Sequence, residues 1–189
     1  MNYDPDKHHR RSIRMRGYDY AQEGVYFVTV CAQDRQCLFG AVADGEMQLN
    51  NSGQIVKAAW DELPARFPSV RLDAFIVMPN HVHGIIIVGA QFIAPSDGFG
   101  TATIDQGVIN HAPTLGEMVR AYKAASTRLI RQAGTPDFAW QRNYYEHVVR
   151  DEESLNRIRQ YILDNPARWE FDRENPAATT LEPEDAWCG

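Results

Sequence analysis

The chain lacks the features that would place it in a membrane or in an oxidising compartment. No stretch of 18 or more apolar residues occurs, and the segment from Met1 to Arg11 has no apolar core of the kind found in signal peptides. The three cysteines are an odd number without Cys-x-x-Cys spacing, which argues against a disulfide framework and against a thiolate zinc site. We therefore expect a cytoplasmic protein, with no membrane partner, whose cysteines are ordinary thiols.

An excess of positive charge is also absent. The net charge is −6 over 189 residues, which by itself argues against a nucleic-acid partner. The placement of the charges weakens that argument, because residues 170–189 contain six acidic residues and one arginine, whereas basic residues gather in residues 1–16 and between residues 120 and 142. Each basic cluster is either a solvated face or part of a nucleic-acid surface.

The most informative feature that is present is a pair of histidines, His81 and His83, just ahead of the apolar run 85–88. Side chains at positions i and i+2 of a strand point the same way, so both imidazoles are expected on one face and Val82 on the other. The unbroken apolar run is typical of a strand covered on both faces. Two such imidazoles form half of a metal site. The alternative is that one histidine caps the strand and the other is a hydrogen-bonded core residue.

The remaining pattern predicts one mixed α+β domain. We predict strands and helices in the order strand 24–31, helix from 51 to 64 or 68, strands 70–78 and 81–88, helix 114–133, strand 144–149 and helix 151–164. This is the ferredoxin-like β-α-β-β-α-β order, a four-stranded antiparallel sheet with both crossover helices on one face, followed by one additional helix. We expect a basic arm over 1–16, the domain over 17–175 with a flexible excursion over 89–113, and an acidic, disordered tail over 176–189.

Apolar positions define the inward side of each predicted helix. For the first helix they are Ile55, Ala58, Ala59 and Leu63, with Val56 as a further candidate. The last helix carries a buried stripe of Leu155, Ile158 and Ile162, with Tyr161 on its border and Asn165 four residues later on the same side. If that side faces the histidines, a phenol and an amide oxygen meet both imidazoles; otherwise Tyr161 is an amphipathic core residue and Asn165 a helix C-cap.

Three motifs occur together: Met78-Pro-Asn-His-Val-His83, Trp140-Gln-Arg-Asn-Tyr-Tyr-Glu-His-Val-Val-Arg150 and Tyr161-Ile-Leu-Asp-Asn-Pro166. In this order and at this spacing, over roughly residues 10–175, the chain resembles the REP-associated tyrosine transposases. These are relatives of the insertion-sequence transposases that act on single-stranded DNA, within the HUH endonuclease superfamily.

The resemblance implies a role for individual residues. His81 and His83 match the two metal-binding histidines, Asn165 the third metal ligand, and Tyr161 the nucleophile, whereas Tyr122 lies one helix too early and is expected in the core. The implied cofactor is Mg²⁺ or Mn²⁺, which suits mixed nitrogen and oxygen ligands. The implied reaction is cleavage and transfer of single-stranded, hairpin-forming repeat DNA through a 5′-phosphotyrosyl intermediate, by a monomer or a homodimer.

Basic and aromatic residues supply the predicted DNA contacts. Basic side chains neutralise phosphates and exposed aromatic rings stack on bases. The candidates are Arg10, Arg11, Arg14, Arg16, Lys123, Arg128, Arg131, Arg142, Trp140, Tyr144 and Tyr145. For Trp140 the alternative is a place in the core.

Three other functions fit the same residues. One is a replication-initiator or relaxase-type nickase, and another is a domesticated DNA- or RNA-binding protein without strand transfer. The third is a small metal-dependent hydrolase that uses water. Only the last two predict that no covalent protein–DNA adduct forms.

Overall fold

The computed structural model describes residues 24–89 and 113–180 of the chain. The predicted basic arm with Arg10, Arg11, Arg14 and Arg16 lies outside these residues, as do residues 90–112 of the predicted excursion and residues 181–189 of the predicted tail. The expectations for those segments stay predictions.

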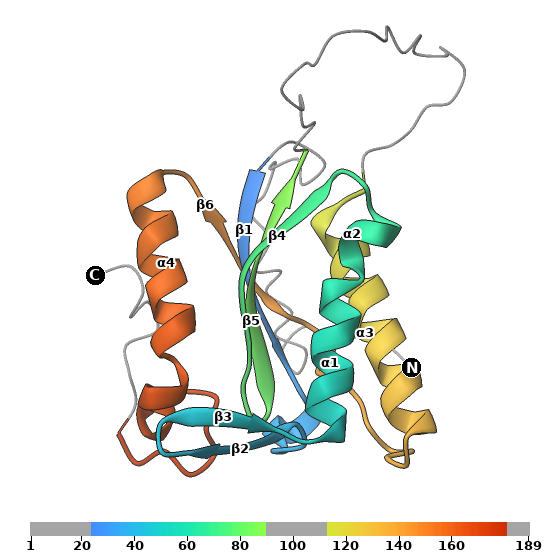
Figure 1. Ribbon diagram of the computed structural model, residues 1–189, viewed down its shortest axis with the longest axis vertical. Helices are drawn as coiled ribbons and strands as arrows, with labels where there is room; N and C mark the ends of the chain where they lie inside the picture. The colour runs from blue at the N-terminus through green and yellow to red at the C-terminus, as the bar shows by residue number, and fades with distance from the viewer. Residues whose placement is uncertain (1–23, 90–112, 181–189) are drawn as a thin grey trace, which may run out of the picture.

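One antiparallel sheet forms the centre of the molecule (Figure 1). The strands β1 (Gly24–Cys31), β4 (Val70–Val77), β5 (His81–Val88) and β6 (Tyr145–Val149) lie in the order β4-β5-β1-β6, and every neighbouring pair is antiparallel. The central strands β1 and β5 pair along their whole length, from Gly24 opposite Val88 to Cys31 opposite His81. The predicted α+β class with a four-stranded antiparallel sheet is confirmed.

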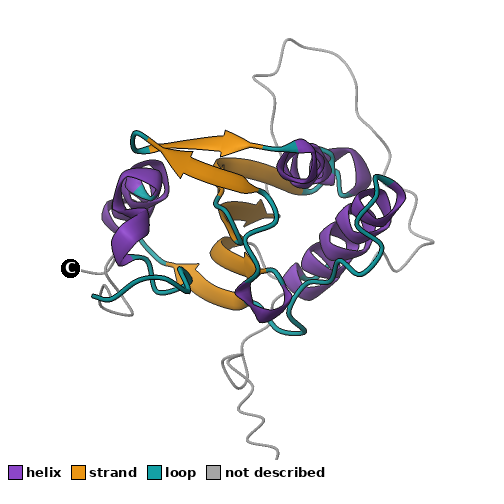
Figure 2. Cartoon of the chain, turned by 90° about the horizontal axis from the view of Figure 1, so that it is seen from below, coloured by secondary structure: helices purple, strands orange, loops and turns teal. Residues whose placement is uncertain are grey.

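Helices cover the two faces of the sheet unequally (Figures 1 and 2). The helices α1 (Asn51–Asp61) and α3 (Leu115–Gln132) lie on one face, and α4 (Glu152–Asp164) lies on the other. Shorter helical segments are η1 (Gln33–Arg35), α2 (Leu63–Arg66) and η2 (Pro166–Phe171). Both crossover helices therefore share a face, as predicted, and the additional helix covers the opposite face.

The predicted helix boundaries are set by side-chain caps. Thr114 and Glu117 form a capping box at the start of α3, and the Asp151 carboxylate accepts a hydrogen bond from the Ser154 amide at the start of α4. The buried stripe Leu155, Ile158 and Ile162 of α4 is also confirmed. This fixes the rotation of α4, and with it the direction of Tyr161.

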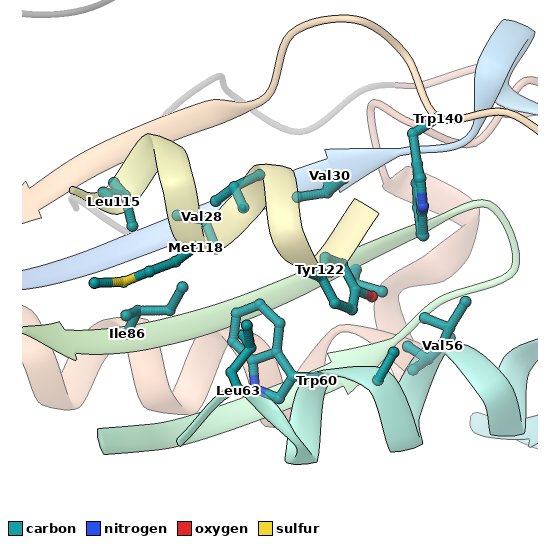
Figure 3. Packing of buried hydrophobic residues seen from close by; sticks show 14 of the residues in the cluster. Val28, Val30, Val56, Trp60, Leu63, Ile86, Leu115, Met118, Tyr122 and Trp140 are labelled. Atoms are coloured by element: carbon teal, nitrogen blue, oxygen red, sulfur yellow. The ribbon is translucent and has the colours of Figure 1, made fainter. Parts of the chain in front are cut away.

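The larger core lies between the sheet and α1 with α3 (Figure 3). In α1 the predicted inward residues Val56 and Ala59 are buried, Ile55 packs against the core and Leu63 follows buried in α2, whereas Ala58 is exposed and the buried Trp60 was not predicted. Trp60 decides the rotation, because its ring stacks on Phe75 at 4.5 Å between centroids. The ring also occupies the space over Gly84 that a Cβ atom there would need.

A small hairpin was not predicted. The strands β2 (Gly40–Ala43) and β3 (Glu46–Leu49) pair with each other, apart from the main sheet. Asp44 and Gly45 join them with positive φ values of 52° and 76°, the backbone that favours Asp-Gly in two-residue hairpin turns. Because both strands are only four residues long and none of their residues is buried, they show little alternation of apolar and polar residues. The dipeptide Asp44-Gly45 was therefore the one sequence feature that indicated a hairpin.

The structure describes two of the three cysteines. Cys31 is a buried free thiol and Cys37 an exposed one, whereas Cys188 lies outside the described residues. Over the stretches 24–89 and 113–180, no helix has the length and apolar character needed to cross a membrane.

Candidate metal and nucleophile site

His81 and His83 lie on the face of the sheet that α4 covers. Val82 between them belongs to the core on the opposite face, as the alternation of the strand requires. The two Nε2 atoms are 3.0 Å apart, and the residues are 0% and 3% exposed. The sheet therefore holds two imidazole nitrogens at one point in the interior of the protein.

A carboxylate completes a group of three candidate metal ligands. Asp172 follows η2, is 5% exposed, and places Oδ2 3.6 Å from His81 Nε2. One ligand atom from each of Asp172, His81 and His83 lies within 4.8 Å of the others. Asp172 Oδ2 has no hydrogen-bond partner among the described residues, so it is available to a cation. In the sequence Asp172 is one of several acidic residues near the C-terminus, and no local pattern indicates that the chain after α4 returns to the histidines.

Asn165, the predicted third ligand, is also buried, with 2% exposure. It is the C-cap residue of α4, and its side-chain Oδ1 has no hydrogen-bond partner within the described part of the chain. A buried amide oxygen without a partner costs free energy unless a ligand satisfies it. Its role as a ligand stays a prediction. If Asp172 also binds, the predicted set of neutral ligands gains one negative charge.

Tyr161 reaches the histidines from α4. Its hydroxyl is 3.5 Å from His83 Nε2, and the two rings lie 5.3 Å apart between centroids. Phe27 of β1 packs edge-on against Tyr161 at 6.1 Å and stacks with His83 at 5.4 Å, so it fixes both rings. Helix α4 thus brings a phenol to the imidazole pair, which is the first of the two alternatives that the sequence left open.

Burial keeps both imidazoles neutral. Loss of solvent lowers the pKa of His81 to about 3, with a further contribution from the Arg35 guanidinium. The pKa of His83 lies well below its usual range for the same reason, and His81 lowers it further, although the Asp172 carboxylate opposes the shift. Neutral imidazoles offer lone pairs, which is the form that binds metal ions.

The residues that hold the histidines were missed as functional positions. Asn80 lies between the predicted strands 70–78 and 81–88, and Thr29 lies within the predicted strand 24–31. The Asn80 amide oxygen lies 2.8 Å from His81 Nδ1, and the Thr29 hydroxyl lies 2.8 Å from His83 Nδ1. Each imidazole is therefore held through the nitrogen that faces away from the other. The Trp169 ring, 6.0 Å from that of His81, lies on the segment that also carries Asp172.

An ion pair ties α4 to the edge of the sheet. Arg159 donates from Nε and Nη2 to the two carboxylate oxygens of Asp73 on β4, at 2.8 and 2.7 Å. Two parallel charge-assisted bonds fix the direction as well as the distance of the pair. Since Arg159 is two residues from Tyr161, this pair helps to hold the tyrosine helix on its own sheet.

Replacing Asp73 with Asn is expected to lower the free energy of unfolding by about 1–2 kcal/mol at pH 7. The Arg159 bonds hold the pKa of Asp73 below its usual range, so this contribution is present above about pH 4 and disappears as the pH falls through the folded-state pKa. Urea unfolding at pH 7 and pH 3 measures both effects. Asp61→Asn, which breaks the exposed Lys57–Asp61 pair of α1, is the control, with an expected change within about 0.5 kcal/mol. Equal stability of Asp73→Asn and the unaltered protein at pH 7 would contradict the role of the pair.

Trp140 is not a stacking surface for bases. It is 8% exposed, packs against Phe39 and Phe138, and donates a hydrogen bond from Nε1 to the Ser126 hydroxyl at 3.0 Å. The DNA contact proposed for it is wrong in this structure, and the alternative place in the core is correct. Tyr122, as expected, is also in the core.

The other predicted DNA contacts divide into two groups. Lys123 donates to the backbone carbonyls of Gln141 and Asn143 and lies over the Tyr144 ring, and burial lowers its pKa to about 8. Its ammonium group is thus used to hold the segment before β6, and the phosphate contact predicted for it has no support in this arrangement. Tyr144 and Tyr145 are half-buried, whereas Arg128, Arg131 and Arg142 are exposed, and their DNA contacts stay predictions.

The donors present fit a divalent cation. Two imidazole nitrogens and one carboxylate oxygen form a mixed nitrogen and oxygen set of the kind that binds Mg²⁺, Mn²⁺ or Zn²⁺. Fold and site together define a class: a ferredoxin-like sheet whose central strand presents a His-x-His pair to a tyrosine on an additional helix.

Comparisons with known proteins agree with this class. No family model matches the chain. A Haemophilus influenzae protein described as "Uncharacterized protein" is 43% identical over 175 residues, covering 90% of this chain and 96% of that protein. A second protein of that organism, described as "Putative REP-associated tyrosine transposase", is 22% identical over 150 residues, 79% of this chain and 74% of that protein. The solved structure of a REP-associated tyrosine transposase bound to a REP hairpin has the same fold, with a TM-score of 0.55 and 20% identity over 82% of this chain and 73% of that chain.

The chain belongs to the family of the first of these Haemophilus proteins. Its predicted resemblance to the REP-associated tyrosine transposases is confirmed, in sequence by the second Haemophilus protein and in fold by the solved structure.

Proposed function

We propose that this protein is a transposase that cleaves and joins single-stranded DNA, with Tyr161 as its nucleophile. One observation carries the proposal: the Tyr161 hydroxyl lies 3.5 Å from His83 Nε2, beside a buried group of side chains able to hold a metal ion. A hydroxyl beside two imidazole nitrogens and a carboxylate lies where a bound cation would act on it. The similarity to transposases supports the reaction class.

His81 and His83, with Asp172 and Asn165 as oxygen donors, would hold a divalent cation, which we propose to be Mg²⁺ or Mn²⁺. Such a cation, when bound, neutralises charge on a scissile phosphate and favours the phenolate form of tyrosine. The two imidazoles are neutral, so Asp172 is the one ligand of the proposed set that brings a negative charge to the cation.

The proposed step balances as a transesterification. The Tyr161 oxygen forms a bond to phosphorus and loses its proton, while the bond from phosphorus to the 3′-oxygen breaks and that oxygen takes up a proton. The products are a 5′-phosphotyrosyl linkage and a free 3′-hydroxyl. Because the phosphodiester bond is exchanged rather than hydrolysed, another 3′-hydroxyl can reverse or redirect the reaction.

Hairpin-forming single-stranded DNA is the proposed substrate. The solved structure that shares the fold holds a REP hairpin, which supports this choice of partner. The exposed arginines Arg128, Arg131 and Arg142, together with the predicted arm, are proposed to contact its phosphates.

Labelled oligonucleotides test the proposal. A hairpin-forming strand from the protein's own genomic neighbourhood, labelled at its 3′ end, is incubated with the protein and Mn²⁺ or Mg²⁺ and separated on a denaturing gel. The label is expected to migrate with the protein, and addition of a second strand with a free 3′-hydroxyl should release it into a longer joined product. Cleavage without an adduct would indicate a hydrolase that uses water, and retardation on native gels without cleavage would indicate a binding protein.

A further inference from the structure

The amide of Asn80 has only one orientation that satisfies its neighbours. Asn80 is 0% exposed, and its Nδ2 lies 3.0 Å from the Arg35 carbonyl oxygen and 2.6 Å from the Glu174 carbonyl oxygen. Carbonyl oxygens only accept hydrogen bonds, so this atom has to be the amide nitrogen. The remaining atom, 2.8 Å from His81 Nδ1, is therefore the amide oxygen.

This orientation determines the tautomer of His81. An amide oxygen cannot donate, so His81 Nδ1 has to carry the proton of the neutral ring. His81 Nε2 then carries a lone pair, and it points at the group formed with His83 and Asp172. A hydrogen bond to the nitrogen that does not bind the metal, like the one between His81 Nδ1 and Asn80, orients histidine ligands in metal sites.

The partner of His83 allows either tautomer. The Thr29 hydroxyl, 2.8 Å from His83 Nδ1, can donate to this nitrogen or accept from it. At the other side of the ring, His83 Nε2 is 3.0 Å from His81 Nε2, the nitrogen that carries the lone pair. Two lone pairs at that distance repel, so in the arrangement seen here His83 Nε2 carries the proton and donates it to His81, while Thr29 donates to Nδ1.

We propose that Asn80 locks His81 in one tautomer, whereas Thr29 lets His83 change tautomer when a divalent cation binds. The inference rests on the metal site of the proposed function. Binding through both Nε2 atoms requires a lone pair on each, so the His83 proton moves from Nε2 to Nδ1. The Thr29 hydroxyl then turns from donor to acceptor. The ring stays neutral and the number of protons is unchanged. Asn80 and Thr29 are positioning residues in this scheme.

The position of Thr29 suits this role. It lies on β1 directly opposite His83 in the register of the central strands, and it is 8% exposed. A threonine hydroxyl in a sheet can direct its proton to a nearby backbone carbonyl once it has become an acceptor. A valine of the same shape offers neither a donor nor an acceptor.

Long-range ¹H–¹⁵N NMR of the histidine side chains in the full protein, without and with Mg²⁺ or Zn²⁺, tests the proposal directly. His81 is expected to carry its proton on Nδ1 in both states. His83 is expected to move its proton from Nε2 to Nδ1 on titration with the ion. An unchanged His83 tautomer on binding would overturn the role of Thr29, and a His81 ring protonated on Nε2 would overturn that of Asn80.

Variants separate positioning from simple structural support. Thr29→Val is expected to weaken binding of the ion about 10- to 100-fold, and Thr29→Ser is expected to restore it. Asn80→Ala is expected to populate both tautomers of His81. Unchanged affinity in Thr29→Val would contradict the proposal even if the variant is less stable.

Failure of the proposed function remains distinguishable from failure of this inference, because the measurements need no DNA. A tautomer change without any strand cleavage would leave the inference intact and overturn the proposed activity. Absence of ion binding up to millimolar concentrations would overturn the inference together with the proposed metal site.

Discussion

Replacing Tyr161 with Phe is expected to abolish the covalent protein–DNA adduct and to slow strand cleavage by at least about 10⁴-fold. The substitution removes only the oxygen that lies 3.5 Å from His83 Nε2. The ring keeps its packing against His83 and Phe27, so folding and DNA affinity are expected to change little. Single-turnover cleavage of a labelled hairpin substrate and native gel shifts measure the two properties separately.

Tyr122→Phe is the matched control for that experiment. It removes a hydroxyl from a tyrosine of α3 that is buried in the opposite core and has no hydrogen-bond partner in the described parts of the chain. Its cleavage rate and adduct yield should equal those of the unaltered protein. An adduct that persists in Tyr161→Phe at the normal yield would assign the nucleophile to another residue.

Replacing His81 with Ala is expected to weaken binding of Mn²⁺ more than about 100-fold, because a ligand is lost and not merely an outer contact. Metal-dependent cleavage should fall in parallel. Since His81 is fully buried, the variant also leaves a cavity, and circular dichroism has to show that it is folded. Titration of Mn²⁺ monitored by electron paramagnetic resonance gives the affinity directly.

His147→Ala is the control for the metal experiment. His147 is a half-buried histidine of β6 that does not belong to the group formed by His81, His83 and Asp172. Its removal should leave Mn²⁺ affinity unchanged. Asp172→Asn and Asn165→Ala then show which oxygen donor is used, through the larger loss of affinity. Equal Mn²⁺ affinity of His81→Ala and the unaltered protein would exclude the site.

Local patterns predicted the elements that carry the site. Period-two alternation placed Val82 opposite the two histidines, and the capping residue Asp151 with the stripe Leu155, Ile158 and Ile162 fixed the start and rotation of α4. These properties depend on residues close together in the chain, so a single sequence is enough to read them. The element order was then sufficient for the fold class.

Other features depend on contacts between distant segments. The rotation of α1 follows from Trp60, whose ring packs over Gly84 of β5. The apolar positions within α1 do not predict this contact with a distant strand. Trp140 is in the core because Phe39, Phe138 and Ser126 close around it, although the residues that follow it, Gln141 and Arg142, are polar. The short hairpin β2–β3 was available only through the dipeptide Asp44-Gly45.

The sequence by itself determined the sheet, the paired histidines on one face and the position of Tyr161 beside the apolar stripe of its helix, because each follows from backbone periodicity. Whether that side of the helix meets the histidines was left open by the sequence and was decided by the tertiary structure. Only the tertiary structure decided that Asp172 approaches the histidines and that Asn80 and Thr29 hold their outer nitrogens. The carboxylate is 91 positions after His81 and the hydroxyl 54 positions before His83. Such contacts arise when the chain folds back on itself, and no spacing along the sequence encodes them.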